Sequence, residues 1–152
     1  MGPIPPGFPD QRPTQVRVLI ADDQALFRQA LAALLRERAG VEVSGEAVNG
    51  EEAIRLAMEL KPDLILMDVT MPVINGLEAA RRLAISLPNT PILIVTMHQN
   101  RELIQTAKEI GVRGYVSKSE VSERLFHAIN EVLSGGTSFS DGASNKANLP
   151  KT

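Results

Sequence analysis

Polar residues directly follow several apolar runs of this sequence, at positions where parallel strands would end. Asp22 and Asp23 follow the run Val16–Ala21, and Asp68 follows the run Leu64–Met67. Ligands of open α/β sheets bind beyond the carboxyl ends of the strands. We therefore expect the three carboxylates to meet at one edge of a sheet.

Two further apolar runs end in residues that could act at the same edge. Thr96 follows Ile92–Val95, and Ser117 and Lys118 follow Gly114–Val116. An ammonium group can pair with a phosphate or with a carboxylate, and a hydroxyl can donate to a phosphoryl oxygen. Each residue alone is ordinary, since a loop lysine is usually solvated and a strand-end threonine is often structural. Their occurrence at successive strand ends favours a shared site.

Three neighbouring carboxylates repel one another in a poorly hydrated cleft, so such a cluster requires a cation. The donors are oxygens and the chain has no cysteine, which favours a hard divalent ion, Mg²⁺ above all. A carboxylate beside a metal ion, a lysine and a hydroxyl can attack phosphorus and form an aspartyl phosphate. The residues therefore predict a Mg²⁺-dependent phosphoryl acceptor.

The elements that must position these residues alternate along the chain. Five apolar runs alternate with five stretches of helical spacing. Four of the runs are those given above, and the fifth is Val41–Ala47. Phe27 belongs to the apolar stripe of the first helical stretch, and its spacing predicts core packing. Four runs are almost continuously apolar, as in strands buried on both faces. Val41–Ala47 alternates instead, which favours an edge position. The pattern predicts a doubly wound α/β domain, (βα)₅, with helices on both faces of a parallel sheet.

Capping residues are expected at the starts of four of these helices. Asn49 is suited to cap the second helix, with Glu52 completing a capping box. Caps for the third, fourth and fifth helices are expected at Asn75, Asn100 and Ser119.

The composition is that of one soluble domain with two tails. The 152 residues include 16 basic and 18 acidic side chains, a formal net charge of −2 that gives no global attraction to nucleic acid or membrane. No apolar run approaches the roughly 20 residues that span a bilayer, so a cytoplasmic location is expected. Proline in residues 1–15 predicts a disordered arm, and residues 135–152 predict a flexible linker or tail. The folded domain is then expected to span 16–134.

Two enzyme-like or cofactor-binding alternatives lack a required feature. A haloacid-dehalogenase-type phosphatase needs a second aspartate two residues after the nucleophile, and Thr70 occupies that position. A Rossmann dinucleotide site needs a glycine-rich turn after the first strand. Here that turn begins with Asp22 and Asp23, whose charges would repel a pyrophosphate.

Four segments together resemble the receiver domain of bacterial response regulators: VRVLIADDQ, LILMDVTMPVINGLEA, ILIVTMH and GVRGYVSKS. The resemblance runs from about Val16 to Leu133. DVTMP and GLEAARRL are similar to the subfamily that carries a C-terminal helix-turn-helix DNA-binding domain. The resemblance implies a flavodoxin-like fold with strand order 2-1-3-4-5.

The resemblance also implies roles at the acidic site. Asp68 would be the phosphoacceptor, receiving its phosphoryl group from a sensor histidine kinase. Asp23 would bind Mg²⁺ directly and Asp22 mainly through water. Asp68 itself and the backbone carbonyl of Thr70 would complete the protein ligands.

Other implied roles concern the response to phosphorylation. Thr96 would bond the phosphoryl group, Lys118 would pair with it, and Tyr115 would be an aromatic switch that turns inward as Thr96 moves. The surface of the fourth helix, fifth strand and fifth helix would carry the output, often as a homodimer. DNA would be bound only through an effector domain expected to be absent from this chain. The chain would catalyse its own phosphorylation and dephosphorylation but act as a signalling protein.

Four positions bear on how the site works. Ser119 stands where many receivers have proline, so no cis bond is expected after Lys118. Met97 stands where a small residue is common, and Thr70 and His98 occupy positions that tune phosphoryl lifetime in this family. Met97 and Ser119 leave one alternative open, a receiver-like interaction module that works without phosphorylation.

Overall fold

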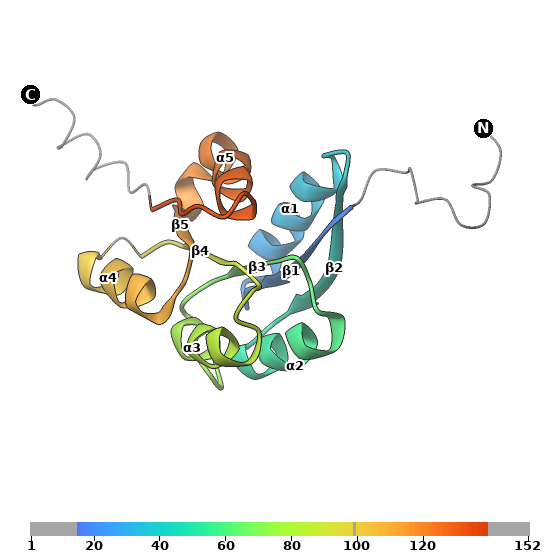
Figure 1. Ribbon diagram of the computed structural model, residues 1–152. Coiled ribbons are helices and arrows are strands. Elements are labelled where there is room, and N and C mark those ends of the chain that lie inside the picture. The colour runs from blue at the N-terminus through green and yellow to red at the C-terminus, as the bar shows by residue number, and fades with distance from the viewer. Residues whose placement is uncertain (1–14, 99, 140–152) are drawn as a thin grey trace, which may run out of the picture.

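The computed structural model describes residues 15–98 and 100–139 as a parallel sheet between two layers of helices (Figure 1). The strands are β1 (Val16–Ala21), β2 (Val41–Ala47), β3 (Leu64–Met67), β4 (Ile92–Thr96) and β5 (Gly114–Ser117). The helices are α1 (Ala25–Arg36), α2 (Gly50–Leu60), α3 (Gly76–Ser86), α4 (Arg101–Ile110) and α5 (Val121–Leu133), with a 3₁₀ turn η1 (Lys118–Glu120) before α5. Strands and helices therefore occur where the sequence pattern predicts them.

The strand order β2-β1-β3-β4-β5 confirms the order expected from the resemblance. All four strand pairs are parallel, and β2 lies at an edge, as its alternating pattern predicts. Helices α1 and α5 cover one face of the sheet, and α2, α3 and α4 cover the other (Figure 1). Parallel strands joined by helices bring all their carboxyl ends to the same edge.

The sheet has a hydrophobic core on each of its two faces, and this explains why the strand sequences are continuously apolar. Successive side chains of a strand point to opposite faces, so Leu64 joins the core under α1 and α5 and Ile65 joins the core under α2, α3 and α4. Both side chains are fully buried. Because neither face of the central strands meets solvent, no polar alternation is needed there.

Three of the four predicted helix caps are confirmed. The amide oxygens of the capping asparagines accept from backbone N–H groups three residues later, at 2.7 Å for Asn49, 2.9 Å for Asn75 and 3.0 Å for Asn100. The Glu52 carboxylate reaches back to the Val48 N–H at 2.8 Å, one residue before the position that a capping box uses.

The prediction of a cap at Ser119 is wrong. Glu120 is the N-cap residue of α5 and makes no side-chain cap hydrogen bond. Ser119 instead lies inside η1, whose N-terminus is capped by the Ser117 hydroxyl, which accepts from the Ser119 N–H at 3.3 Å. The 3₁₀ turn is three residues long and occupies the position where the cap and the start of the helix were expected, so α5 begins only at Val121. Within the described ranges there are no cis peptide bonds, as expected for the Lys118–Ser119 bond.

The packed domain extends past residue 134. Residues 135–139, which belong to the segment expected to be a flexible linker, return to β5, where Ser138 forms a parallel bridge with Gly114. The predicted arm lies outside the described residues except for its last residue, and the rest of the linker segment, 140–152, lies outside them too. Over the described part of the chain, no helix has the length and apolar content needed to span a membrane.

Candidate functional site

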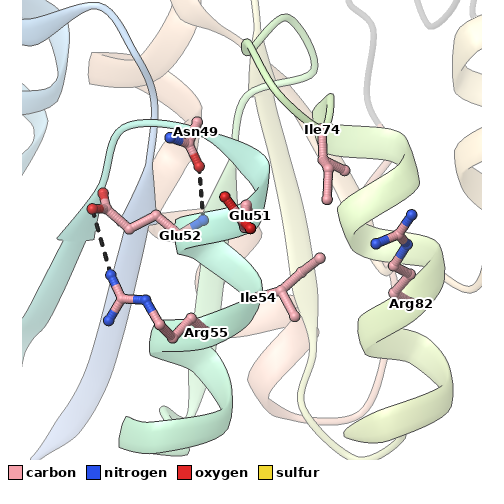
Figure 2. Close-up of a pocket in the computed structure, with 7 residues that line it drawn as sticks. All are labelled: Asn49, Glu51, Glu52, Ile54, Arg55, Ile74 and Arg82. Atoms are coloured by element: carbon pink, nitrogen blue, oxygen red, sulfur yellow. Dashed lines mark hydrogen bonds and ion pairs between the residues drawn. The ribbon is translucent and has the colours of Figure 1, made fainter.

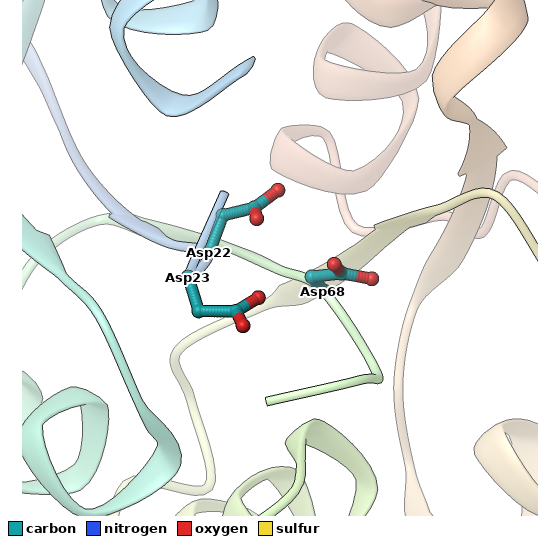
Figure 3. A group of neighbouring side chains, drawn as sticks. All are labelled: Asp22, Asp23 and Asp68. Carbon is teal, nitrogen blue, oxygen red and sulfur yellow. The ribbon is translucent and has the colours of Figure 1, made fainter. Parts of the chain in front are cut away.

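The three aspartates come together at the carboxyl edge of the sheet (Figure 3). Asp22 and Asp23 follow β1, and Asp68 follows β3, its direct neighbour in the sheet. One carboxylate oxygen from each residue lies within 4.8 Å of the others. Asp22 and Asp68 are buried, whereas Asp23 is exposed. The arrangement has two enclosed carboxylates and one that faces solvent.

Lys118 links the two buried carboxylates. Its Nζ lies 2.7 Å from Asp22 Oδ2 and 3.0 Å from Asp68 Oδ2, with the lysine side chain only 5% exposed. The other oxygen of each carboxylate accepts a backbone N–H, from Gln24 at 2.8 Å for Asp22 and from Val69 at 2.7 Å for Asp68. Both buried carboxylates are therefore held in place from two sides.

Burial shifts the titration of Asp22. Loss of solvent raises the pKa of its carboxyl above the ordinary value of 3.8, the hydrogen bonds from Lys118 and the Gln24 N–H oppose this, and the nearby Asp68 charge adds to it. One lysine thus offsets only part of the cost of gathering three acidic groups. The cluster offers oxygen donors alone, which fits a hard cation such as Mg²⁺.

A chain of contacts joins the ends of β3, β4 and β5 beside the carboxylates. Thr96 is fully buried, and its Oγ1 accepts from the His98 N–H at 3.4 Å. The His98 ring Nε2 lies 2.7 Å from Thr70 Oγ1, on the loop after Asp68. Tyr115 is buried, and its hydroxyl donates to the His98 carbonyl. The sequence names all of these residues as candidates, but their connection through His98 appears only in the structure.

The sequence pattern did not place two residues, Gln24 and Phe27, at the site. Gln24 Oε1 accepts from Lys118 Nζ at 2.7 Å, and the same nitrogen lies 4.5 Å from the centroid of the Phe27 ring. A cation over an aromatic face is favourable. Phe27 has a helical spacing that predicts core packing, and it does pack against the core under α1 and α5. Its second role as a contact of Lys118 depends on the loop after β5, which no local pattern places.

A separate groove of about 490 Å³ runs between α2 and α3 (Figure 2). It is lined by Asn49, Glu51, Glu52, Ile54, Arg55, Ile74 and Arg82. Glu52 pairs with Arg55 at 3.6 Å, and Arg82 pairs with Glu78 at 2.9 Å. None of the three clustered aspartates lines it. The ion pairs of these charged side chains join residues three or four positions apart on one helix, as is common on helix surfaces. The residues described in the groove therefore show no sign of a ligand site, and we place the candidate functional site at the three aspartates.

Proteins of known class share this chain's sequence and fold. The transcriptional regulatory protein LnrK of Bacillus subtilis is 40% identical over 121 residues, which are 80% of this chain and 55% of LnrK. A LuxR-family two-component response regulator from Aurantimonas superposes with a TM-score of 0.82 at 35% identity, covering 87% of this chain and 94% of that structure. A LuxR-family DNA-binding response regulator from Staphylococcus aureus gives a TM-score of 0.74 at 30% identity, covering 78% and 98%.

The curated relatives are longer proteins. This chain spans about half the length of those it matches, 55% in the case of LnrK. The model of the response regulator receiver domain matches residues 18–130, a range that contains β2 to β5 and most of β1 and carries the acidic cluster, Thr96 and Lys118. Sequence, fold and site thus agree, and the chain belongs to the response regulator receiver domain family, whose members are phosphorylation-dependent signalling domains.

Proposed function

We propose that Asp68 is the phosphoacceptor of a Mg²⁺-dependent switch. The observation that carries this proposal is the contact of Lys118 Nζ with Asp68 Oδ2 at 3.0 Å, beside Asp22 and Asp23. In the transfer, a new P–O bond forms at a carboxylate oxygen of Asp68 while the bond from phosphorus to the donor breaks. Lys118 is placed to stabilise negative charge on the transferred group.

The donor set fits a magnesium ion. Asp23, Asp68, the backbone carbonyl of Thr70 and, through water, Asp22 would hold it, and the oxygens of the three carboxylates lie close enough together to share one ion. When bound, the ion would supply charge neutralisation for the carboxylates and the phosphoryl oxygens. The side chains of the protein would position the carboxylate of Asp68, and that carboxylate would accept the phosphoryl group.

Thr96 is the residue that we assign to sensing the phosphoryl group. Its hydroxyl lies at the end of β4, next to β3, and its present contact with the His98 N–H is long at 3.4 Å. A phosphoryl oxygen would accept a charge-assisted hydrogen bond from this hydroxyl, which only accepts in its present contact with His98. Movement of Thr96 toward the phosphoryl oxygen would release His98 and change the environment of Tyr115, whose hydroxyl binds the same residue.

The partners follow from the same proposal. A sensor histidine kinase would supply the phosphoryl group from a phosphohistidine, the P–N bond breaking as the P–O bond forms. We propose transcription as the output, supported by the regulatory class of LnrK and the DNA-binding class of the Staphylococcus aureus protein. Contact with DNA would come from a domain outside this chain. A homodimer through the surface of α4, β5 and α5 would be the means of control, in the cytoplasm.

Intact mass tests the proposal directly. The protein is incubated with an acyl phosphate and Mg²⁺, then quenched rapidly. We expect one phosphoryl increment in the wild type and in Asp63→Asn, a control at the opposite end of β3, but none in Asp68→Asn or without Mg²⁺. Absence of the increment in the wild type would favour the interaction module that works without phosphorylation.

A further inference from the structure

The chain reverses direction after α5 through a defined helix cap. The Gly136 N–H donates to the Glu131 carbonyl at 2.9 Å, and the Gly135 N–H donates to the Val132 carbonyl at 3.2 Å. These two bonds, with Gly135 at φ +95°, form a Schellman motif, in which a left-handed residue is most easily supplied by glycine. The direction of the following residues is therefore set by the end of the helix.

The next residues add to the outer edge of β5. The Ser138 N–H donates to the Arg113 carbonyl at 2.9 Å, and its carbonyl accepts from the Tyr115 N–H at 2.8 Å. A Cβ atom at Gly114 would lie 2.8 Å from the Ser138 carbonyl oxygen, so the close approach depends on glycine there. Ser138 thus forms an isolated parallel bridge with Gly114 at the outer edge of β5, and the chain that follows α5 passes beside β5 (Figure 1).

Phe139 ties the same segment to α4. Its ring packs against the core under α2, α3 and α4, the core that also contains Tyr115. Lys108 of α4 places its Nζ 5.0 Å from the ring centroid, a favourable cation–π arrangement. The segment is therefore held by β5 through its backbone and by α4 through its side chain.

Tyr115 connects this segment to the candidate site. Its backbone N–H holds Ser138, while its hydroxyl holds the His98 carbonyl. His98 in turn donates its N–H to Thr96 at the end of β4. One buried residue thus has bonds both to the loop beside the aspartates and to the segment after α5.

We propose that the segment Gly136–Phe139 is an output element, whose docking on β5 is coupled to phosphorylation of Asp68 through Tyr115. The inference rests on the function proposed above and extends it to the chain beyond α5. When Thr96 turns to the phosphoryl group, it releases the His98 N–H, and the loop that contains His98 can then change position. Tyr115, whose hydroxyl binds the His98 carbonyl, responds to that change, and its position determines how firmly Ser138 is held. Tyr115 is already buried in this structure, so phosphorylation would tighten docking by raising the population of this buried position. The shift can be no larger than the difference in contacts between the two states.

Amide exchange measures this docking at the two bonds that define it. The N–H groups of Tyr115 and Ser138 are followed by NMR in the whole chain, with Mg²⁺ and with or without beryllofluoride as a phosphoryl mimic. We expect the mimic to slow their exchange by about fivefold or more. Acyl-phosphate labelling, read as intact mass, is run in parallel on every variant.

Two variants separate coupling from simple folding. Tyr115→Phe removes the hydroxyl bond to His98 but keeps the backbone bond to Ser138, so it should be labelled normally and lose the effect of the mimic. Phe139→Ala should speed Ser138 exchange in both states and should still be labelled. Leu133→Ala, at the exposed end of α5, is the control and should change neither the Ser138 exchange rate nor the labelling.

The outcomes distinguish this inference from the proposed function. Normal labelling with unchanged exchange at Tyr115 and Ser138 would overturn the coupling and leave Asp68 as phosphoacceptor. Absence of labelling in the wild type would overturn both. A Tyr115→Phe protein that still responds to the mimic would also refute the coupling, because the path through His98 would then be unnecessary.

Discussion

Lys118 Nζ lies 3.0 Å from Asp68 Oδ2, although the two residues are 50 positions apart in the chain. Asp22 binds the same nitrogen at 2.7 Å, so one cation holds together the ends of β1 and β3 and the loop after β5. The lysine is a structural counter-ion before any phosphoryl group arrives. Lys118 therefore has a structural role as a counter-ion and a proposed role in phosphoryl transfer, and its replacement should affect both stability and phosphorylation.

Replacement of Lys118 with methionine should destabilise the domain in the absence of Mg²⁺. Two buried carboxylates would lose their shared cation, and breaking a buried pair from one side costs about 3–5 kcal/mol. We expect a loss of about 3 kcal/mol in the free energy of unfolding, measured by urea denaturation. Lys118→Arg keeps the charge and should lose less. An unchanged midpoint for Lys118→Met would show that the ion pair contributes nothing to stability.

Magnesium should stabilise the wild type in a pH-dependent manner. Burial raises the pKa of Asp22 above 3.8, so in the metal-free protein its contribution to stability is present at low pH and is lost as the pH rises through the raised value. Mg²⁺ competes with protons for this cluster. At 100 times its Kd the ion should add about 2.7 kcal/mol near neutral pH, and this gain should shrink as the pH falls toward 4.

Calorimetry with and without Mg²⁺ across this pH range checks the magnesium prediction. Asp23→Asn should abolish the gain, while Glu42→Gln, an exposed substitution on β2, should retain it. A Mg²⁺ effect of equal size in both variants would mean that the ion binds elsewhere.

Gly76→Ala should damage both stability and phosphorylation. A Cβ atom at Gly76 would lie 1.9 Å from the Asp68 carbonyl oxygen, so either α3 or the phosphoacceptor backbone must move. We expect a loss of about 2 kcal/mol or more, typical of overpacking, with slower labelling by an acyl phosphate. Gly45→Ala is the control, because its Cβ would meet the flexible end of Leu60 at 2.8 Å. Equal labelling rates for the two variants would contradict the prediction.

Thr70 and His98 should affect the lifetime of the aspartyl phosphate together, through the contact between their side chains. The 2.7 Å bond joins the loops after β3 and β4, which flank Asp68. Its loss should loosen both loops and shorten the lifetime of the aspartyl phosphate by about two- to fivefold, the lower end of the range for residues in contact. Phosphoryl loss is followed by intact mass for Thr70→Ala, His98→Ala and the double variant. The double variant should match either single one, and additive effects would show that the residues act separately.

Local patterns were sufficient to predict most of the fold. Apolar runs, helical stripes and asparagine caps depend on residues within a few positions of one another, so they identify β1 to β5 and three of the four caps. They also show that Asp22, Asp23, Asp68 and Lys118 follow strands. Since parallel strands end at one edge, a common site follows without knowledge of any distance. The prediction of a cap at Ser119 failed because 3₁₀ turns are frequent at the ends of α-helices, and the local pattern did not distinguish such a turn from the first turn of a helix.

Contacts between distant parts of the chain were decided only by the tertiary structure. Lys118 meets Gln24 across 94 positions, and Ser138 meets Tyr115 only because a Schellman motif returns the chain to an unpaired strand edge. Such contacts depend on the packing of α5 against the sheet and on the strand order. Both are determined by interactions throughout the core and not by any short segment of sequence. The residue types therefore determine which chemistry is possible, and the packing of the two cores determines which of those residues meet.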